Sequence, residues 1–266
     1  MNSASIGILG GSGFYDFLKN AHTIEMDTPY GKPSGKITLG EYKGKNVAFL
    51  PRHGKGHIYP PHQIPYRANV WAFKQLGVQF ILGPCASGSL RPDIKPGDFV
   101  VCDQFVDRTK GRIDTFFEGP KVAHVEAAEP YCLNLGKIAV EEGRKLGIQI
   151  HPKGTVVVIQ GPRFSTKAES KWFSSAGFDV INMTQYPECI LARELEMCYS
   201  GIALITDYDV GLSDYPEIKP VTIEEVLRTF KENNEKLRNL LFAIIEKIEI
   251  GKSCRCHSAM KNAFLN

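Results

Sequence analysis

The sequence predicts a single α/β domain in which helices flank a central mixed β-sheet. Short segments that are apolar at consecutive positions alternate with longer stretches at helical spacing along the 266 residues. Consecutive apolar positions are typical of strands covered on both faces, as in parallel or mixed sheets. No linker, repeat or low-complexity tract divides the chain. We therefore expect one domain over residues 1–250 and a C-terminal tail, residues 251–266, that carries a C-x-C motif.

The expected elements follow in chain order. IGILG is a short strand, and KITLGEY and NVAFLPR form a hairpin. Apolar positions at helical spacing predict a helix over residues 64–77 that stops at Gly77. Buried strands are expected in VQFILGPCA, FVVCDQFVD, GTVVVIQG, FDVINMT and SGIALITDYD, with helices near residues 130–147, 167–177 and 187–198.

The last helix has the clearest pattern. Thr222 and Glu225 predict a capping box at its start. One apolar stripe then runs along it at helical spacing; its members are Ile223, Val226, Leu227, Phe230, Leu237, Leu241, Ile244 and Ile248.

Composition and charge exclude several classes of function. The net charge is only +3, from 32 basic and 29 acidic side chains, which is too small for a surface that binds nucleic acid or membranes. No segment approaches the ~18 apolar residues of a membrane span. The N-terminus has no Lys or Arg before its apolar segment, unlike a secretory signal. We therefore expect a cytoplasmic location.

The seven cysteines do not predict a metal site. Five are scattered, and Cys254 and Cys256 form the C-x-C. This spacing is not that of a zinc site, so reduced thiols and no bound metal are expected.

Polar residues follow the predicted strands where each strand ends. Ligands of open α/β sheets bind beyond the carboxyl ends of the strands. We therefore expect the site to be built from these strand exits: GGSG at 10–13, RHG at 52–54, PCASG at 84–88, GPRF at 161–164, NMT at 182–184 and TDYD at 206–209.

The first exits offer candidate groups for an anion. Asp16 replaces the last glycine of a dinucleotide fingerprint, and Glu246 replaces the first glycine of a Walker A loop. The glycine run is then either a tight turn or a backbone nest for one phosphate, with the Ser12 hydroxyl as a further donor. Arg52 has the planar fork that suits phosphate, although it could equally be a surface ion-pair partner. His53 and His57 follow it.

Asp207 and Asp209 are two residues apart, a spacing that places both on one face of a strand. Two close carboxylates repel, which raises the pKa of one and favours a retained proton. A protonated carboxyl can donate to a ring nitrogen. A helix N-cap or a metal site is the alternative, although no histidine or third carboxylate lies nearby in the sequence.

Taken together, the exits resemble the trimeric branch of the nucleoside phosphorylase family. The matching strings run in order from residue 6 to about residue 210: GILGGSG, DTPYGKPS, PRHGKGH, PPHQIPYRAN, GSLR, PGDFVVCDQFVDRT, GPRFST, AES, INMTQYPE and TDYD. The TDYD and NMT versions are more similar to the subfamily that acts on 5′-methylthioadenosine than to the 6-oxopurine enzymes.

The resemblance implies a role for particular side chains. Phosphate would be bound by Ser12, Arg52, His53, Ala86 and Thr184. Cys85 occupies a phosphate-site position where many relatives carry a threonine that donates; a thiol is a weak donor, and Cys85 could confer sensitivity to oxidants or alkylating agents. The substrate would contact Phe164 and Asp207 with Asp209 at the base, Met183 at the ribose, and the apolar wall of Ile223, Val226 and Leu227 at the 5′ end, with His57 and His124 as further candidates.

The resemblance also implies the reaction and the assembly. Phosphorolysis of 5′-methylthioadenosine would yield adenine and 5-methylthioribose-1-phosphate, with phosphate as co-substrate, no cofactor, and Asp207 as general acid. A purine nucleoside phosphorylase acting on inosine or guanosine, a hydrolytic nucleosidase and a non-catalytic nucleoside-binding module remain alternatives. The family is a homotrimer or a dimer of trimers, in which His124 would reach a neighbouring subunit's site. Cys132 and Cys198 match cysteines that are bridged in some thermophilic relatives, whereas Cys254 and Cys256 would be free or locally paired.

Overall fold

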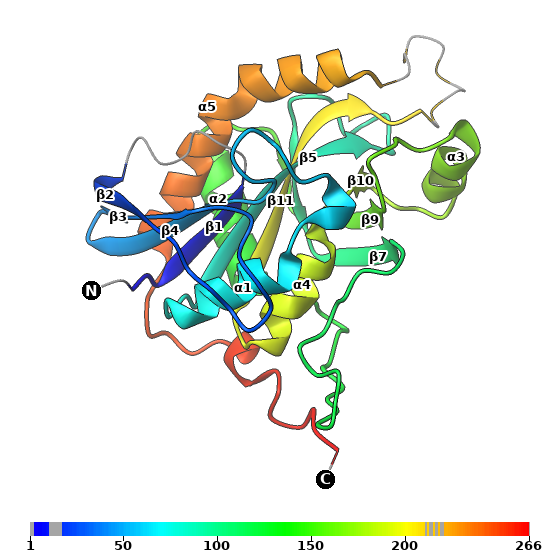
Figure 1. The fold of residues 1–266 in the computed structure, drawn as a ribbon. Helices are drawn as coiled ribbons and strands as arrows, with labels where there is room; N and C mark the ends of the chain where they lie inside the picture. Colours follow the sequence, from blue (N-terminus) through cyan, green and yellow to red (C-terminus); the bar gives the residue numbers. More distant parts are fainter. Residues whose placement is uncertain are drawn as a thin grey trace.

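The computed structural model describes residues 3–10, 18–210, 212, 215, 218 and 221–265. Within them, one mixed sheet is flanked by helices (Figure 1), as the sequence predicted. The strands are β1 (Ile6–Gly10), β2 (Lys19–Ile24), β3 (Ile37–Tyr42), β4 (Lys45–Pro51), β5 (Phe80–Ser89), β6 (Phe99–Cys102), β7 (Gln104–Arg108), β8 (Ile150–His151), β9 (Thr155–Ile159), β10 (Val180–Asn182) and β11 (Cys198–Tyr208).

The helices of the described chain cover both faces of this sheet. The α-helices are α1 (Tyr66–Gln75), α2 (Leu133–Lys145), α3 (Lys167–Ser175), α4 (Gln185–Glu194) and α5 (Ile223–Lys247), and the short 3₁₀ helices are η1 (Pro61–Gln63) and η2 (Arg255–Ser258). None of these helices combines the length and the apolarity needed to cross a bilayer.

The sheet branches at β5. Its main path runs in the order β2-β3-β4-β1-β5-β10-β9-β7, and β11 pairs with β5 and continues to β6 and β8. β5 is parallel to both β1 and β11, whereas β10 is antiparallel to β5. The carboxyl ends of β5 and β11 therefore lie side by side, and the long central strands bring the residues that follow them to one edge.

Alternate residues of the central strands pack into two different cores. In β1, Ile6 and Ile8 face the core formed with α2 and α5, while Leu9 faces the core formed with α1 and α4. Both faces of the strand are thereby removed from water, which explains the consecutive apolar residues in the sequence. A smaller cluster around Phe173 and Ile181 joins α3 to the sheet.

The last helix divides into two parts. Its C-terminal turns are core: Leu237, Leu241 and Ile244 are fully buried. Its first turns are not, because Ile223 and Leu227 are 58% and 61% exposed. The apolar stripe is therefore continuous in its spacing along the helix, but its first members are exposed and its later members are buried in the core.

One of the two capped helix starts in the structure was predicted from the sequence. The Thr222 hydroxyl accepts from the backbone N–H of Glu225 at 3.2 Å, as expected for the start of α5. A complete capping box that the sequence analysis did not name begins α3, where the hydroxyl of Thr166 and the carboxylate of Glu169 each accept from the other's backbone N–H.

Two expectations about strands were wrong in detail. The segment FVVCDQFVD, expected as one strand, is two strands, since Asp103 turns the chain between β6 and β7 and its carboxylate accepts from the N–H of Gly154. Strands β2 and β8 had no expected counterpart; β2 is exposed along nearly its whole length and therefore lacks an apolar pattern.

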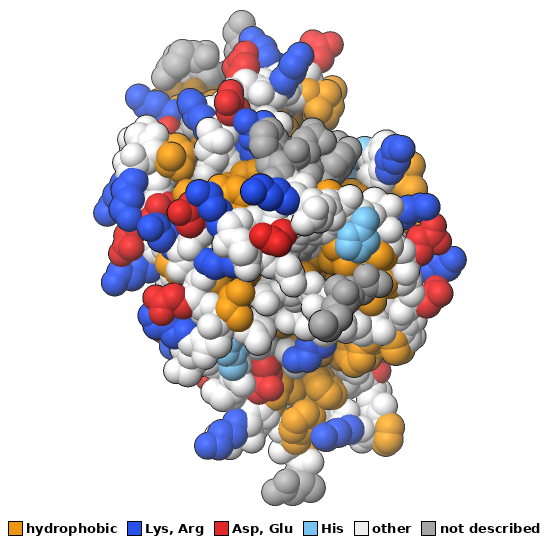
Figure 2. Space-filling model, turned by 90° about the vertical axis from the view of Figure 1, so that its left-hand side faces the viewer, with side chains coloured by type: hydrophobic (Ala, Val, Ile, Leu, Met, Phe, Trp, Pro, Cys, Tyr) orange, Lys and Arg blue, Asp and Glu red, His pale blue; other side chains and the backbone are white. Residues whose placement is uncertain are grey.

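The C-terminal tail packs against the body of the protein. Cys256, Met260 and Ala263 are buried, and Phe264 forms a bridge with Ala123. Basic and acidic side chains are interspersed over the face drawn in Figure 2, as the low net charge leads one to expect.

Candidate active site

A cavity of about 610 Å³ lies where β5, β10 and β11 end, beneath the first turns of α5. Nearly all of the residues proposed from the sequence line it. These are Arg52, His53, His57, Cys85, Ala86, Phe164, Met183, Thr184, Asp207, Asp209, Ile223, Val226 and Leu227.

Two proposed residues are not among those that line the cavity. Ser12 lies outside the described residues. His124 is exposed, and its backbone N–H donates to the carbonyl of Ala263 in the C-terminal tail. Its expected place is a neighbouring subunit's site, and a single chain does not test that prediction.

A bulge in β11 presents Asp207 to the cavity. The register with β5 shifts between Ile205 and Asp207, so Thr206 is an extra residue in the pairing. Such a bulge re-aims the side chain that follows it. The Thr206 hydroxyl donates to Oδ1 of Asp207 at 2.7 Å, and a Cβ at Gly88 would lie 3.0 Å from Oδ2. The Thr206 hydrogen bond thus orients Asp207, and the absence of a side chain at Gly88 leaves room for its carboxylate.

Burial raises the pKa of Asp207 to about 6, which the Thr206 hydrogen bond opposes and the charge of Asp209 reinforces. Desolvation is the larger cause, because the carboxyl is only 5% exposed. The raised pKa predicted for one carboxyl of this pair is therefore found at Asp207, and its carboxyl can hold a proton close to neutral pH.

Asp209 follows β11 and is also buried, which raises its pKa. The hydroxyls of Ser165 and Ser170 lie close enough to oppose the rise without reaching hydrogen-bond geometry. Among the described residues, Oδ2 of Asp209 and Oγ of Ser165 have no hydrogen-bond partner. Buried polar atoms without partners in a cavity are suited to a ligand's polar groups. Sequence reasoning missed Ser165, which follows Phe164 in the matched string GPRFST.

Arg52 is held by a buried ion pair. Its Nε and Nη2 donate to the Glu188 carboxylate at 2.5 and 3.0 Å, and further N–H groups donate to the carbonyls of Pro84 and Leu9. Arg52 does form an ion pair, as the alternative had it, but not at the surface. The side chains of Arg52 and Glu188 are only 3% and 0% exposed. Although burial opposes it, Glu188 raises the pKa of Arg52, so the guanidinium stays charged.

Within the part of the chain that the structure describes, these bonds occupy four of the five guanidinium N–H groups and leave one on Nη1 for a ligand. Arg52 therefore supplies a fixed positive charge and a single N–H donor. The sequence had led us to expect a planar guanidinium whose donors face phosphate. Glu188 also accepts from the Tyr199 hydroxyl at 2.8 Å. It was missed as a functional residue, although it ends the matched string INMTQYPE.

The surroundings of His53 favour its neutral form. Burial and the neighbouring Arg52 lower its pKa to about 4, against a hydrogen bond to the Tyr59 carbonyl. That bond joins Nδ1 and the carbonyl oxygen at 2.8 Å, so Nδ1 carries the proton and Nε2 is an acceptor. The His57 ring stacks on it with centroids 4.0 Å apart. His53 is then not a second cation for phosphate, but it can accept from a protonated phosphate oxygen or a hydroxyl.

Cys85 is a buried acceptor. The side-chain amides of Asn182 and Gln185 donate to its sulfur at 3.3 and 3.2 Å, and burial raises the pKa of the thiol. A buried thiol with a raised pKa is unreactive. The expected sensitivity to alkylating agents and oxidants is therefore not supported. Asn182 and Gln185 hold this strand exit in place and were missed as positioning residues.

Thr184 lies at the N-terminus of α4. It occupies the N-cap position but makes no capping hydrogen bond with its side chain. The hydroxyl of this 6%-exposed residue remains available to a ligand, whereas the backbone departs from helical geometry at Tyr186, so the regular turns of α4 begin beyond that residue. Oδ1 of Asn182 accepts from the N–H groups of Thr184 and Gln185 and fixes the turn.

The remaining lining is apolar. Phe164 is 38% exposed, a large ring face open to the cavity. Met183 packs against Gly161, where an added Cβ would lie 2.6 Å from the sulfur. The exposed side chains of Ile223 and Leu227 form the opposite wall, so the first turns of α5 do not belong to the core.

Residues 5–246 match the model of a family described as the phosphorylase superfamily. The chain belongs to the phosphorylase superfamily. It is 52% identical over 269 residues to S-methyl-5′-thioadenosine phosphorylase of Saccharolobus solfataricus, with 98% of this chain and 97% of that protein covered.

Solved structures of this superfamily agree with the fold. A methylthioadenosine phosphorylase from an antarctic soil metagenomic library superposes with a TM-score of 0.93 at 39% identity, covering 100% of this chain and 93% of that one. An S12T mutant of the adenosine/methylthioadenosine phosphorylase of Schistosoma mansoni, in complex with methylthioadenosine, gives a TM-score of 0.88 at 37% identity, covering 97% and 96% of the two chains.

Proposed function

We propose that this phosphorylase cleaves 5′-methylthioadenosine with inorganic phosphate, yielding adenine and 5-methylthioribose-1-phosphate. The observation that carries the proposal is one cavity that combines three features. A protonatable, buried Asp207 lies among its lining residues together with the charged Arg52 and the apolar side chains of Ile223 and Leu227. The relatives named above carry the same activity in their names.

Phosphate is the proposed nucleophile at the ribosyl C1′ carbon. The free N–H of Arg52 and the Thr184 hydroxyl supply donors, with Ser12 as a further candidate. Nε2 of His53 accepts from a protonated phosphate oxygen. Holding phosphate against the anomeric carbon supplies proximity and stabilises the positive charge that develops on the ribosyl ring.

The purine is the leaving group, and Asp207 is the proposed general acid. As the C1′–N9 bond breaks, the Asp207 proton passes to N7, so adenine departs neutral while a phosphate oxygen forms the new bond to C1′. A carboxyl with a pKa of about 6 can deliver a proton near neutral pH, which a carboxyl near its usual value of ~3.9 would do poorly.

The cavity lining supports a preference for a 6-aminopurine nucleoside with an apolar 5′ group. Asp207 and Asp209 can accept from a 6-amino group, whereas a 6-oxo group would face a carboxylate and leave a buried polar group poorly paired, at ~1–3 kcal/mol. At the other end, burying a methylthio group against Ile223 and Leu227 gains about 25 cal/mol per Å² of apolar surface. A 5′-hydroxyl would lose water there without a partner.

We further propose that the active assembly is a homotrimer or a dimer of trimers. His124 is exposed on the chain and does not line its own cavity, which leaves it free to reach the site of a neighbouring subunit. The proposed chemistry requires no metal or organic cofactor and is suited to a cytoplasmic enzyme.

The test is release of adenine from methylthioadenosine with and without phosphate. We expect turnover only with phosphate. Equal release in phosphate-free buffer would make the protein a hydrolase, and binding without release under both conditions would make it a nucleoside-binding protein.

A further inference from the structure

One arginine in the loop that follows β7, Arg112, holds three separate segments of the chain together. Both terminal nitrogens of its guanidinium donate twice. Nη1 donates to the Tyr66 hydroxyl at 3.1 Å and to the Tyr186 carbonyl at 2.6 Å. Nη2 donates to the Gln160 carbonyl at 2.9 Å and to the Ile159 carbonyl at 3.4 Å. The acceptors are 46 to 74 positions away from Arg112 in the sequence.

The segment around Gln160 leads to the base end of the cavity. Ile159 ends β9 and lines the cavity, and the chain continues from Gln160 to Phe164, the ring expected to contact the purine. The side chain of Gln160 adds a second tie to the same loop. Its Oε1 accepts from the N–H of Lys110, and its Nε2 donates to the carbonyl of Lys110, both at 2.9 Å. The end of β9 is therefore held by residues 110–112.

The segment around Tyr186 leads to the phosphate end. The backbone departs from helical geometry at Tyr186, where the carbonyl accepts from Arg112, and the Tyr186 hydroxyl donates to the carboxylate of Asp114 in the same loop. Glu188, which holds Arg52 in the buried ion pair, follows directly after Pro187. The loop therefore also fixes the start of the helix that orients the charge proposed to face phosphate.

The third segment is reached through Tyr66. Its hydroxyl accepts from Arg112 and donates to the carbonyl of Pro61 at 2.7 Å. Pro61 lines the cavity as well. Arg112 thus acts on three parts of the cavity wall without lining the cavity itself.

The surroundings of Arg112 favour a functional reason for its charge. Its hydrogen-bond partners in the described chain are three carbonyls and a hydroxyl, with no carboxylate among them. Its Nε is buried and has no partner among the described residues. Burial lowers the pKa of Arg112, against the opposing effects of Tyr66 and Asp107. Removing a charge from water without an ionic partner destabilises a fold, and groups in this state cluster at functional sites.

We propose that Arg112 is a positioning residue for the phosphorolysis described above, on which this inference rests: it fixes the spacing between the base end and the phosphate end of the cavity. The bond that breaks, C1′–N9, lies between the purine and the attacking phosphate, and Arg112 joins the segments that lead to both. Reacting atoms must lie about 3–3.5 Å apart, and a misplacement of ~1 Å can lower the rate ~10²-fold. Loss of Arg112 should therefore slow the chemical step more than it weakens the binding of either ligand alone.

The test separates kcat from ligand binding in the Arg112→Met variant, which keeps an apolar side chain of similar length and removes the donors. We expect kcat for methylthioadenosine at saturating phosphate to fall ~10²-fold. The dissociation constants of adenine alone and of inorganic phosphate alone, measured by calorimetry without turnover, should stay within about threefold of the parent values. Arg112→Lys keeps the charge but not the planar fork of donors, and should still lower kcat roughly tenfold.

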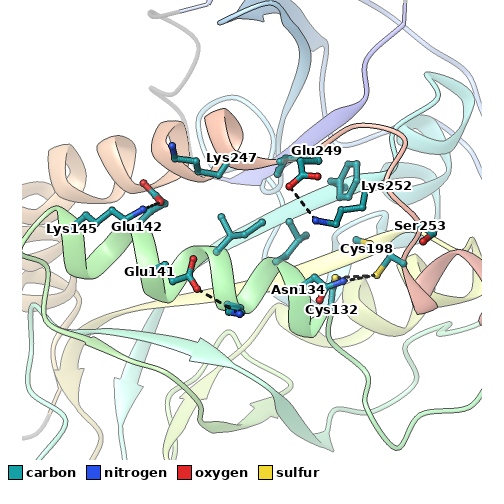
Figure 3. Close-up of a pocket in the computed structure, with 16 residues that line it drawn as sticks. Cys132, Asn134, Glu141, Glu142, Lys145, Cys198, Lys247, Glu249, Lys252 and Ser253 are labelled. Atoms are coloured by element: carbon teal, nitrogen blue, oxygen red, sulfur yellow. Dashed lines mark hydrogen bonds and ion pairs between the residues drawn. The ribbon is translucent and has the colours of Figure 1, made fainter.

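Lys145→Met is the matched control. Lys145 pairs with Glu142 in a groove of about 430 Å³ between α2 and α5 (Figure 3). No described residue lines both this groove and the active-site cavity. The control removes a cationic side chain elsewhere on the molecule and should leave kcat and both dissociation constants unchanged.

Two results would overturn the role of Arg112. One is a kcat equal to that of the parent in a folded Arg112→Met or Arg112→Lys protein; the lysine variant keeps the test decisive if the methionine variant does not fold. The other is a rise in the dissociation constants of adenine and phosphate as large as the fall in kcat, because Arg112 would then only support the fold of each subsite. A parent that releases no adenine in the presence of phosphate would instead refute the proposed function itself.

Discussion

Arg52 and Glu188 form a fully buried ion pair, with Nε of the arginine 2.5 Å from Oε1 of the glutamate. The two residues are 136 positions apart in sequence. The pair joins the end of β4 to α4, so the charge proposed to face phosphate is positioned by the helix that follows Thr184, a second proposed phosphate donor.

Glu188→Gln should therefore impair phosphate binding. The variant keeps a hydrogen-bonding side chain but removes the charge that orients the guanidinium, and charged hydrogen bonds of this kind are worth ~1.5–3 kcal/mol. We expect the KM for phosphate to rise roughly tenfold or more, with a smaller change in the KM for the nucleoside. Steady-state kinetics at varied phosphate measure it.

Glu142→Gln is the matched control, since Glu142 is also buried but pairs with Lys145 on α2, away from the cavity. It should leave the KM for phosphate unchanged. If Glu188→Gln behaves like this control while remaining folded, Arg52 does not act on phosphate through the pair.

Asp207→Asn should lower kcat far more than it weakens substrate binding. Asparagine can donate a hydrogen bond but cannot deliver a proton, and general acid catalysis is worth ~10²–10⁴-fold. Separate measurement of kcat and the dissociation constant for the nucleoside tests this. A kcat within a few-fold of the parent would restrict Asp207 to positioning the base.

The same substitution should change how stability depends on pH. The folded-state pKa of Asp207, about 6, lies above its unfolded value of ~3.9. The folded state therefore binds the proton more tightly, and this contribution is present below about pH 4 and lost as pH rises through 6.

Asp207→Asn removes this loss of stability with rising pH, because asparagine does not titrate. Relative to the parent, its free energy of unfolding should rise by about 2 kcal/mol between pH 4 and pH 8. Denaturant unfolding at the two pH values measures the difference. A constant offset between the two proteins would show that Asp207 is not desolvated in the folded state.

Leu227→Gln should reduce the preference for a methylthio group. Leu227 is 61% exposed before substrate binds, so its replacement should change stability by less than about 0.5 kcal/mol. It should lower kcat/KM for methylthioadenosine roughly tenfold, because burial of a leucine-sized apolar surface is worth ~1.5–3 kcal/mol. Adenosine should be affected less. The comparably exposed Leu146, at the end of α2, provides the control Leu146→Gln.

The order of substrates should be methylthioadenosine, then adenosine, then inosine. The 6-amino group pairs with the Asp207–Asp209 carboxyls, and the methylthio group fits the α5 wall. Values of kcat/KM for the three nucleosides at saturating phosphate give the order. Inosine equal to or better than methylthioadenosine would indicate a broader purine nucleoside phosphorylase.

The sequence predicted the sheet and most of the cavity because both are local patterns. Polar residues near the carboxyl ends of apolar strands, such as Asp207 in the last residues of the β11 pattern and Thr184 shortly after β10, are visible without a structure. Glu188 was not, since nothing near it in the chain shows that its partner is Arg52. The neutral state of His53 could not be predicted either, because it depends on the Tyr59 carbonyl and on burial.

Helical periodicity likewise could not separate the two parts of α5. Leu227 and Leu237 fit the same stripe, yet one is 61% exposed above the cavity and the other is fully buried. The difference arises because the sheet ends beneath the first turns of the helix. The expected proximity of Cys132 and Cys198 is confirmed, and the two sulfurs of the C-terminal C-x-C motif also lie within 4.8 Å of theirs. The sequence pattern could not show this grouping, because the four cysteines come from three segments that only the fold brings together.

Phosphate, and not water, is proposed to take the ribosyl group from methylthioadenosine. The most direct measurement is ³¹P NMR of a reaction mixture, with free adenine quantified in the same sample. We expect one new sugar phosphate resonance that grows in step with adenine as inorganic phosphate is consumed. Adenine released with no new phosphate ester would contradict it.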